Sequence, residues 1–394
     1  MVTQDYDAVV IGGGIAGSSA ARSLSLNGVK TLIVEKNSNT EKPGCAEAVT
    51  SYFLPLLPFE IPKNQLKMKI DGIKFYSDGL SITQKGKMWE AFSIEREDFN
   101  PWLTNLALNS GAKLSANSEL VRLKINDDGY VSKLIITKNK KNIEINPKLI
   151  IAADGAKSTV AKELNLIKER KASFAYITSF EMSNLNITNP KLEQIFFDDY
   201  IPKGFAYIFP KSLHRANIGA GSVLFNDRTE EFFDEFINFN IVNKQLKGGK
   251  VVVDRSGFAP VDYCLENNVY KNVIFTGDAA NQNIKPFIEG ILPGIICGNI
   301  AGECGSNYLK NNAKLTDYDK IIDKKFGEIF SLSDQILSFM LKIFEQKDKK
   351  DYLLLLALCS DLFKLEKFDQ LFDLSYQELR ERLQNKISNR NLQH

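Results

Sequence analysis

Histidine is almost absent from this chain: its 394 residues include two, and one of these, His394, is the last residue. His214 alone is too little for a histidine-rich metal site, a Ser-His-Asp triad or a histidine acid–base pair. The net charge is low as well: 50 basic and 48 acidic residues give a sum of +2. We therefore expect neither a metal site nor nucleic-acid binding through bulk positive charge.

Cysteine is scarce too, with five residues in an odd count and no CxxC pair. A disulfide framework or a structural zinc site is not expected, and a reducing, cytoplasmic location fits this pattern. The N-terminus lacks the basic and apolar regions of a signal peptide. No apolar run reaches the length of about 18 residues that a membrane-spanning helix needs. The hydrophobic fraction of 44% predicts a large globular core.

A βαβ unit is predicted at the start of the chain. A short apolar strand precedes Gly12, Gly14 and Gly17, which have GxGxxG spacing and open a helix of small residues. The next strand ends at Glu35, where dinucleotide-binding folds place an acid for the ribose hydroxyls. In such folds the glycines permit the tight turn, the approach of a pyrophosphate to the helix N-terminus, and close helix–strand packing. A glycine turn used only for packing is the alternative interpretation.

Two later strands favour FAD over NAD. One buried strand ends in Asp154-Gly155, and another ends in Gly277-Asp278. Ligands collect at the carboxyl ends of strands in an open α/β sheet, and an acid there suits the hydroxyl groups of a ribityl chain. A helix N-cap aspartate is the alternative, and it fits Asp154 better than Asp278.

The remaining pattern predicts a second sheet and a helical end. Residues 51–94 and 172–225 contain period-two stretches typical of antiparallel strands, residues 229–247 resemble one amphipathic helix, and the chain from Thr316 onward is helical. The predicted class is α/β: a Rossmann-type FAD-binding domain, an antiparallel β-sheet substrate domain and a C-terminal helical region. The expected ranges are 1–50, 95–168 and 255–315 for the first, 51–94 and 169–254 for the second, and 316–394 for the third.

Three further stretches carry a family resemblance. Residues 42–48 (KPGCAEA) look like a cysteine loop, residues 204–211 (GFAYIFPK) like a YxWxFP segment, and residues 277–291 like a GDAA…KP…GGGI block. With the glycine-rich opening, they resemble the geranylgeranyl reductase family within the para-hydroxybenzoate hydroxylase type of FAD-dependent oxidoreductases. The resemblance covers about residues 5–310. It departs from the family at Tyr207, Ala46 and Glu289, where Trp, Gly and Gly are usual.

The resemblance implies which residues bind FAD. The adenosine half would contact the glycine turn, the ribityl and phosphate region would contact Asp278, and backbone N–H groups near Gly290 would face the isoalloxazine. For Arg96, a surface charge at a helix start is the alternative. The implied cofactor-binding residues are Gly12, Gly14, Ala16, Gly17, Glu35, Lys36, Cys45, Ala46, Arg96, Asp154, Gly155, Gly277, Asp278, Gly290, Ile291 and Leu292.

The family activity is reduction of isolated prenyl double bonds by reduced FAD, which implies an apolar polyprenyl substrate: an ether-lipid precursor, a prenyl diphosphate or a prenylquinone. Saturating an alkene also needs a proton. With no suitable histidine, we expect Cys45 and Tyr207 at the catalytic position, with Cys45 gating or protonating the substrate. A small buried hydrophobe is the alternative for Cys45. Tyr207, Phe209, Pro286 and Phe287 are the predicted substrate contacts, and core packing is the alternative for Phe209.

The reductant and the membrane contact stay open. Only one dinucleotide fingerprint is present, so the electron donor is either NAD(P)H that visits the flavin or a ferredoxin-like protein. The C-terminal helices could form a cap, line a substrate tunnel or contact a membrane peripherally. A flavin monooxygenase or halogenase and a non-catalytic electron-transfer flavoprotein are the competing functions. The halogenase tryptophan motif is missing, because Trp89 and Trp102 are the only tryptophans.

Overall fold

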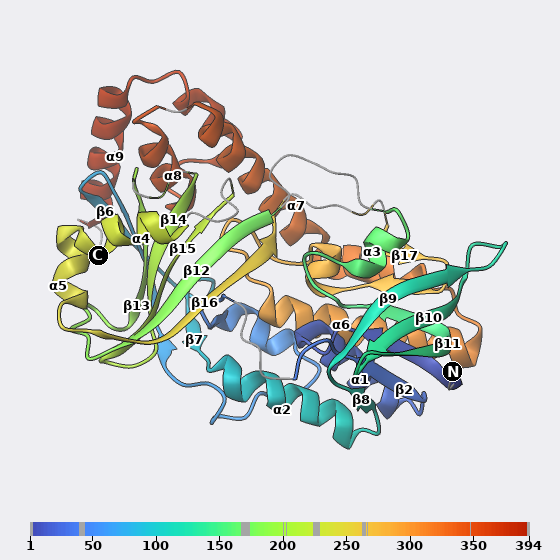
Figure 1. Cartoon of the computed structure of the whole chain (residues 1–394). Helices are drawn as coiled ribbons and strands as arrows, with labels where there is room; N and C mark the ends of the chain where they lie inside the picture. Colours follow the sequence, from blue (N-terminus) through green and yellow to red (C-terminus); the bar gives the residue numbers. More distant parts are fainter. Residues whose placement is uncertain are drawn as a thin grey trace.

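The fold contains two large β-sheets, a small third sheet and a helical C-terminal region (Figure 1). The computed structural model describes residues 3–38, 44–166, 174–199, 201, 203–223, 229–261, 265, 267–346 and 348–391. The α/β class expected from the sequence is confirmed.

The first sheet has eight strands, and its centre is parallel in the order β18-β11-β1-β2-β8. Strands β9 and β10 extend it from β11 as antiparallel neighbours, and β17 pairs antiparallel with β18. The strands are β1 (Thr3–Ile11), β2 (Thr31–Val34), β8 (Lys113–Ser115), β9 (Ser118–Ile125), β10 (Val131–Lys138), β11 (Lys141–Ala152), β17 (Val269–Tyr270) and β18 (Val273–Phe275).

The central strands are buried on both faces, as parallel strands usually are. Val10 of β1 faces a core formed with helices α1 (Ile15–Leu26), α2 (Arg96–Asn109) and α6 (Ile291–Asn311). Val9 and Ile11 face the opposite core, which includes β9, β10 and the short helix α3 (Thr159–Glu163). The strand is therefore the middle layer of this half of the molecule.

Helices α1 and α6 approach each other so closely that α6 needs glycine. A Cβ on Gly298 would lie 2.2 Å from the carbonyl oxygen of Ala16, and one on Gly302 would lie 2.5 Å from that of Ala20. Gly298 and Gly302 therefore fix the spacing between α6 and α1, the helix that follows the glycine turn.

The second sheet has seven strands in the order β16-β12-β15-β14-β13-β5-β6. Its neighbours are antiparallel, as expected, except that β5 and β13 run parallel. In the chain, β5 lies between β2 and β8 and β13 lies between β11 and β17, so no hairpin joins the two strands and fixes their relative direction. The strands are β5 (Gly72–Ser77), β6 (Leu80–Lys85), β12 (Phe174–Ser183), β13 (Leu192–Phe197), β14 (Gly204–Pro210), β15 (Arg215–Ser222) and β16 (Lys250–Pro260), and a small third sheet contains β3 (Ala48–Thr50), β4 (Lys69–Ile70) and β7 (Ala91–Ser93), with the 3-10 helix η1 (Ser51–Leu56) after β3.

The predicted single helix over 229–247 is wrong, because the chain forms α4 (Thr229–Asn238) and α5 (Asn240–Leu246). Phe239 between them has an extended backbone, with φ −60° and ψ 130°, which interrupts the helical hydrogen bonds. No glycine or proline marks this break in the sequence, and both pieces keep an amphipathic pattern.

The C-terminal region consists of helices and begins with the long helix α7 (Asp317–Gln346). Early residues of α7, including Phe326, pack in the core of the first sheet, and later ones, including Met340, pack in the core of the second. Figure 1 shows α7 running from one half of the molecule to the other, with α8 (Asp351–Cys359) and α9 (Tyr376–Asn391) beyond it. The 3-10 helix η3 (Leu365–Leu371) connects these last two helices.

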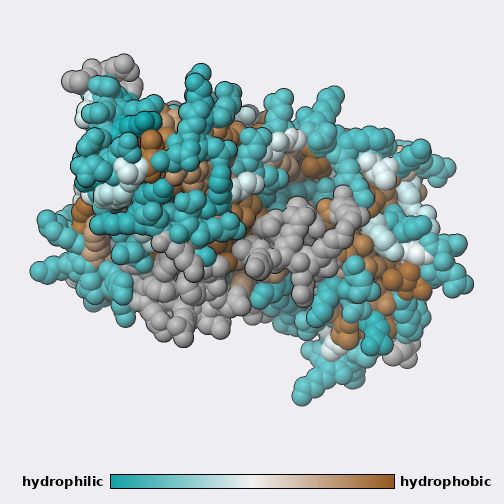
Figure 2. Space-filling model, turned by 90° about the horizontal axis from the view of Figure 1, so that it is seen from above, coloured by the Kyte–Doolittle hydropathy of each residue, from teal (hydrophilic) through white to brown (hydrophobic). Residues whose placement is uncertain are grey.

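Hydrophilic side chains cover most of the face shown in Figure 2, and hydrophobic residues appear there as separate patches. Among the described residues, none of the helices combines the length and the apolar character required to pass through a bilayer.

Candidate active site

One cavity of about 1240 Å³ lies between the two sheets. It extends from the glycine turn after β1 to the end of α8, where Cys359 lines it. This volume exceeds the range of about 300–1,000 Å³ typical of small-molecule sites, so it has room for more than one ligand. The predicted residues that line it are Gly12, Gly14, Ala16, Glu35, Lys36, Cys45, Ala46, Arg96, Asp154, Gly155, Tyr207, Phe209, Gly277, Asp278, Pro286, Phe287, Gly290 and Ile291.

Two predicted residues, Gly17 and Leu292, do not line the cavity. A Cβ on Gly17 would lie 1.9 Å from the carbonyl oxygen of Gly12, so Gly17 serves the packing of α1 against the turn. Leu292 is fully buried in the core beside α1.

The glycine turn has the shape of an anion cradle. Gly12 has φ +97°, and a Cβ on it would lie 2.2 Å from the carbonyl oxygen of Ala153. A Cβ on Gly14 would meet no protein atom within 4 Å, so this residue faces open space. Gly14 is also the N-cap of α1, whose first turn has no acidic residue and no side-chain cap. The N–H groups at this helix end are therefore available to a phosphate.

Glu35 is held beside this turn by backbone N–H groups. Its Oε2 accepts a hydrogen bond from the Gly13 N–H at 2.6 Å, and its Oε1 accepts one from the Asn37 N–H at 2.9 Å. These bonds fix the carboxylate at the cavity wall, where its remaining lone pairs can accept hydrogen bonds from ribose hydroxyls.

The two aspartates at the strand ends differ. The Asp154 carboxylate accepts hydrogen bonds from the Ser158 hydroxyl at 2.7 Å and the Val160 N–H at 3.0 Å, so it also serves the start of α3. Burial raises the pKa of Asp154. Asp278, in the 3-10 helix η2 (Gly277–Ala280), has no such bond among the described residues. Burial raises the pKa of Asp278 to about 6, against the charges of Arg96 and Lys285.

Cys45 lies in a loop that is pinned to the second sheet. The Gly44 N–H donates to the Ser256 carbonyl at 3.2 Å, and the Asn217 amide donates to the Cys45 carbonyl at 2.7 Å. The Cys45 Sγ accepts the Glu47 N–H at 3.3 Å. The thiol is half-buried and free, and it borders the cavity. Residues 42 and 43 of the cysteine-loop motif lie outside the described residues.

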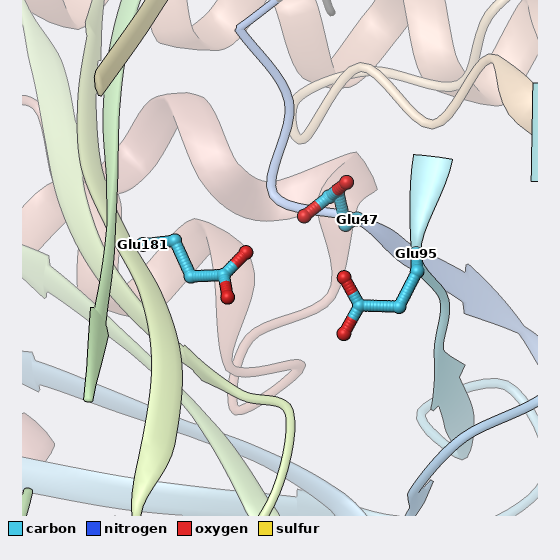
Figure 3. Close-up of side chains that lie close together, drawn as sticks. All are labelled: Glu47, Glu95 and Glu181. Atoms are coloured by element: carbon cyan, nitrogen blue, oxygen red, sulfur yellow. The ribbon is translucent and has the colours of Figure 1, made fainter. Parts of the chain in front are cut away.

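A buried ion-pair network also holds the loop that contains Cys45 and Glu47. The Lys211 Nζ donates to Glu47 at 2.7 Å, to Glu95 at 2.5 Å and to Glu181 at 3.0 Å. Figure 3 shows these three carboxylates pointing toward one another from the cysteine loop, the start of α2 and β12. The Lys211 ammonium therefore occupies the position where such a cluster would otherwise hold a cation. Arg255 adds a contact to Glu47 at 3.0 Å.

Sequence reasoning assigned no role to this network or to Glu193. Glu47 lies in the cysteine-loop motif and Lys211 ends the segment over residues 204–211. The sequence signal that could have indicated their role is a charged residue among apolar ones. Glu193 is 8% exposed and lines the cavity from β13, where it shares a strand face with the apolar Ile195 and Phe197. Burial and the nearby Glu289 raise its pKa to about 8.

The far part of the cavity is apolar. Tyr207 and Phe209 lie on one face of β14 with their ring centroids 5.0 Å apart, and both border the cavity. The Phe287 ring lies 5.7 Å from that of Phe205. Helix α7 contributes further lining residues, among them Leu337 and Met340. The C-terminal helical region thus forms part of the cavity wall. Of the cap, the tunnel wall and the membrane contact, this corresponds to the tunnel wall.

The residues at the first sheet fit FAD. The open space over Gly14, the free N-terminus of α1 and the fixed Glu35 carboxylate suit a dinucleotide. The helix α6 also begins beside the cavity, at Gly290, without a side-chain cap or an acidic first turn. Its N–H groups therefore suit an electron-rich ring edge.

Comparisons with known proteins agree with this geometry. The FAD binding domain family matches residues 5–211, and the geranylgeranyl reductase catalytic domain family matches residues 175–257. A digeranylgeranylglycerophospholipid reductase of Methanococcus aeolicus is 30% identical over 322 residues, which is 81% of this chain and 81% of that protein. Digeranylgeranylglycerophospholipid reductase 3 of Methanosphaera stadtmanae is 31% identical over 344 residues, 84% of this chain and 85% of the relative.

Solved structures share the fold. A geranylgeranyl bacteriochlorophyll reductase-like protein from Thermoplasma acidophilum matches with a TM-score of 0.80 and 22% identity, covering 98% of this chain and 100% of that one. A flavin-dependent brominase matches with a TM-score of 0.71 and 16% identity, covering 93% of this chain and 98% of that one. On the sequence relationships above, the chain belongs to the geranylgeranyl reductase family of FAD-dependent oxidoreductases.

Proposed function

We propose that this protein saturates isolated double bonds in the geranylgeranyl chains of a digeranylgeranylglycerophospholipid, the substrate named for its relatives. The observation that carries the proposal is one continuous cavity with two different ends. Its first end has the glycine turn and Asp278, and its second end has the aromatic residues of β14 and the apolar side of α7. A polar cofactor and a long apolar chain can therefore meet inside it.

FAD, when bound and reduced, supplies a hydride for the double bond. The residues of this chain position the reactants and exclude water. In the proposed arrangement the glycine turn and Glu35 hold the adenosine half, Asp278 contacts the ribityl region, and Arg96 faces Asp278 across the cavity. Arg96 is fixed there because its Nε donates to Asn100 at 2.8 Å and its backbone N–H donates to Glu47 at 2.9 Å.

Tyr207 is proposed to contact the prenyl chain, with Phe209, Pro286 and Phe287 around it. Burial raises the pKa of Tyr207, so its hydroxyl stays neutral. An aromatic, dry wall suits an alkene, which has no polar group to bond.

Peripheral membrane contact is proposed at the rim of the cavity. Met88 and Leu332 line the cavity and are 64% and 47% exposed. Exposed apolar side chains at an opening of this kind suit a substrate that is drawn from a lipid layer. For the electron donor, NAD(P)H and a ferredoxin-like protein remain the two candidates.

The proposed function predicts a specific mass change. We expect the purified protein to release FAD on denaturation and, after dithionite reduction without oxygen, to add two hydrogens to each saturated bond of a digeranylgeranyl phospholipid. Mass spectrometry of the lipid product measures this gain. Oxygen-dependent product formation with NADPH would support a monooxygenase instead. Flavin reduction without any lipid turnover would support an electron-transfer protein.

Replacement of Cys45 should slow the reaction at the lipid step. We propose that the Cys45 thiol gates the substrate beside the flavin, because it borders the cavity and its loop is pinned by Asn217. In Cys45→Ser and Cys45→Ala, reoxidation of the reduced flavin by a prenyl lipid should be at least about tenfold slower in a single turnover. Dithionite reduction should be unchanged. Wild-type reoxidation rates in both variants would reject this role.

A further inference from the structure

Saturation of a carbon–carbon double bond needs a proton as well as a hydride. The hydride comes from the flavin, so an acid of the chain must face the cavity and keep its proton at neutral pH. His214 does not line the cavity, and its ring Nδ1 lies 3.1 Å from the Leu185 carbonyl. The acid therefore has to be sought among the other titratable residues of the cavity wall.

Glu193 lies on the face of the second sheet that carries the predicted substrate contacts. On β13 it shares a face with Ile195, and Ile195 pairs directly with Tyr207 of the antiparallel strand β14. By the same register, Glu193 lies beside Phe209. Its side chain is thus placed among apolar and aromatic residues at the cavity wall.

One oxygen of the Glu193 carboxyl group is buried without a hydrogen-bond partner in the part of the chain that the structure describes. This atom is Oε1, and the residue is 8% exposed. The contrast with Glu181 is clear: that carboxylate, on the same sheet, is bonded to Lys211 at 3.0 Å. A buried carboxyl without a cation is held in its neutral form, because ionisation would leave an unpaired charge.

A second carboxyl group reinforces this state. Glu289 accepts hydrogen bonds from the Thr50 hydroxyl at 2.9 Å and the Thr50 N–H at 3.1 Å, and it lines the cavity near Glu193. Burial raises the pKa of Glu289 to about 7. Burial and Glu289 raise the pKa of Glu193 to about 8. Glu193 therefore carries a proton at neutral pH, directly beside the apolar part of the cavity.

We propose that Glu193 is the general acid of the reaction, an inference that rests on the proposed function. The proton of its carboxyl O–H forms a new C–H bond at one alkene carbon, while the hydride forms the C–H bond at the other. The electron pair of the broken O–H bond stays on the carboxylate, which then takes a proton from water. Cys45, which also lines the cavity, keeps the proposed gating role.

Other ionisable groups border the same cavity from elements around β13. Their titration can also contribute to the pH dependence of the reaction rate. Among them, Glu289 is the group whose charge raises the pKa of Glu193. The ionisable side chains that line the cavity besides Glu193 are Glu35, Lys36, Cys45, Glu47, Tyr52, Arg96, Glu119, Asp154, Lys157, Lys203, Tyr207, Asp254, Arg255, Asp278, Lys285, Glu289, Cys359 and Asp361.

Replacement of Glu193 in the FAD-loaded protein tests the proposal. In Glu193→Gln we expect unchanged FAD content and dithionite reduction, but reoxidation by a digeranylgeranyl phospholipid at least about 100-fold slower. The wild-type rate should fall as the pH rises through about 8. In Glu289→Gln this alkaline limb should move to lower pH, because the neighbouring negative charge is removed. Glu60→Gln, at an exposed position, is the matched control and should behave like the wild type.

A second measurement does not depend on turnover. The infrared carbonyl absorption of protonated carboxyl groups at pH 7, to which Glu289 also contributes, should be weaker in Glu193→Gln than in the wild type. If the wild type reduces the lipid and Glu193→Gln does so at the same rate, the proposal is overturned. A carbonyl absorption that the substitution leaves unchanged would also overturn it. Absence of lipid reduction in the wild type would instead reject the proposed function. If Glu193→Gln does not fold, an unshifted alkaline limb in Glu289→Gln overturns it.

Discussion

Replacing Lys211 with methionine should lower the free energy of unfolding by about 3–5 kcal/mol, the usual result of removing one partner from a buried ion pair. The Lys211 side chain is 1% exposed and contacts Glu47, Glu95 and Glu181. Without its ammonium group, the remaining cationic partners of the three carboxylates among the described residues are Arg215 and Arg255. Denaturant unfolding at pH 7 measures the loss.

The pH dependence gives this prediction a sign. Burial raises the pKa of Glu181, but the hydrogen bonds from Arg215 and Lys211 outweigh it and leave that pKa below its ordinary value. A carboxyl with a lowered pKa stabilises the fold above its unfolded pKa, and this contribution is lost as the pH falls through the folded pKa. The deficit of Lys211→Met should therefore be largest near neutral pH and shrink in acid.

A matched control uses an exposed lysine. Lys320 contacts Asp317 at 2.8 Å, with side chains 72% and 43% exposed, and solvent screens this pair. Lys320→Met should leave the unfolding curve unchanged within error. Equal effects of the two substitutions would show that the buried network does not stabilise the fold.

Two glycines of the same turn should respond to alanine in different ways. Gly14→Ala should leave the melting temperature of the FAD-free protein unchanged, because the added methyl group meets no protein atom within 4 Å. It should weaken FAD binding by about tenfold or more, equivalent to at least about 1.4 kcal/mol, because the methyl group projects into the proposed pyrophosphate site. Titration of the FAD-free protein with FAD measures this change.

Gly17→Ala is the counterpart that should damage the fold itself. Its Cβ would lie 1.9 Å from the Gly12 carbonyl oxygen, so α1 would have to move away from the turn. We expect a loss of about 3 kcal/mol in stability even without FAD, as overpacking of a core produces. If Gly14→Ala destabilises the FAD-free protein as much as Gly17→Ala, then both glycines serve packing and the assignment of the turn to phosphate is wrong.

Local sequence pattern was sufficient to predict the turn and the strand ends on which several candidate site residues lie. The turn from Gly12 to Gly17, Glu35 at the end of β2 and Asp278 after β18 follow from strand–turn–helix signals within short windows. The cofactor-binding half of the fold could therefore be predicted. The same holds for Tyr207 and Phe209, since alternation along one strand places them on one face.

The network and Glu193 could not be predicted in the same way. Lys211 meets carboxylates that are 30, 116 and 164 residues away in the chain. Such contacts depend on how the two sheets and the cysteine loop are placed together, which no local pattern encodes. The parallel pairing of β5 with β13 has the same cause, and it contributes to the setting of Glu193, which pairs with Ile73.

The long helix α7 constrains how a lipid enters. Its side chains belong to the cores of both sheets, and Ser333 and Ile336 between these regions line the cavity. A hinge motion that separates the two sheets would bend a continuous helix of 30 residues and expose both hydrophobic cores. We therefore expect the prenyl chain to thread into the cavity end-first through its rim, so that the bonds farthest from the headgroup travel deepest.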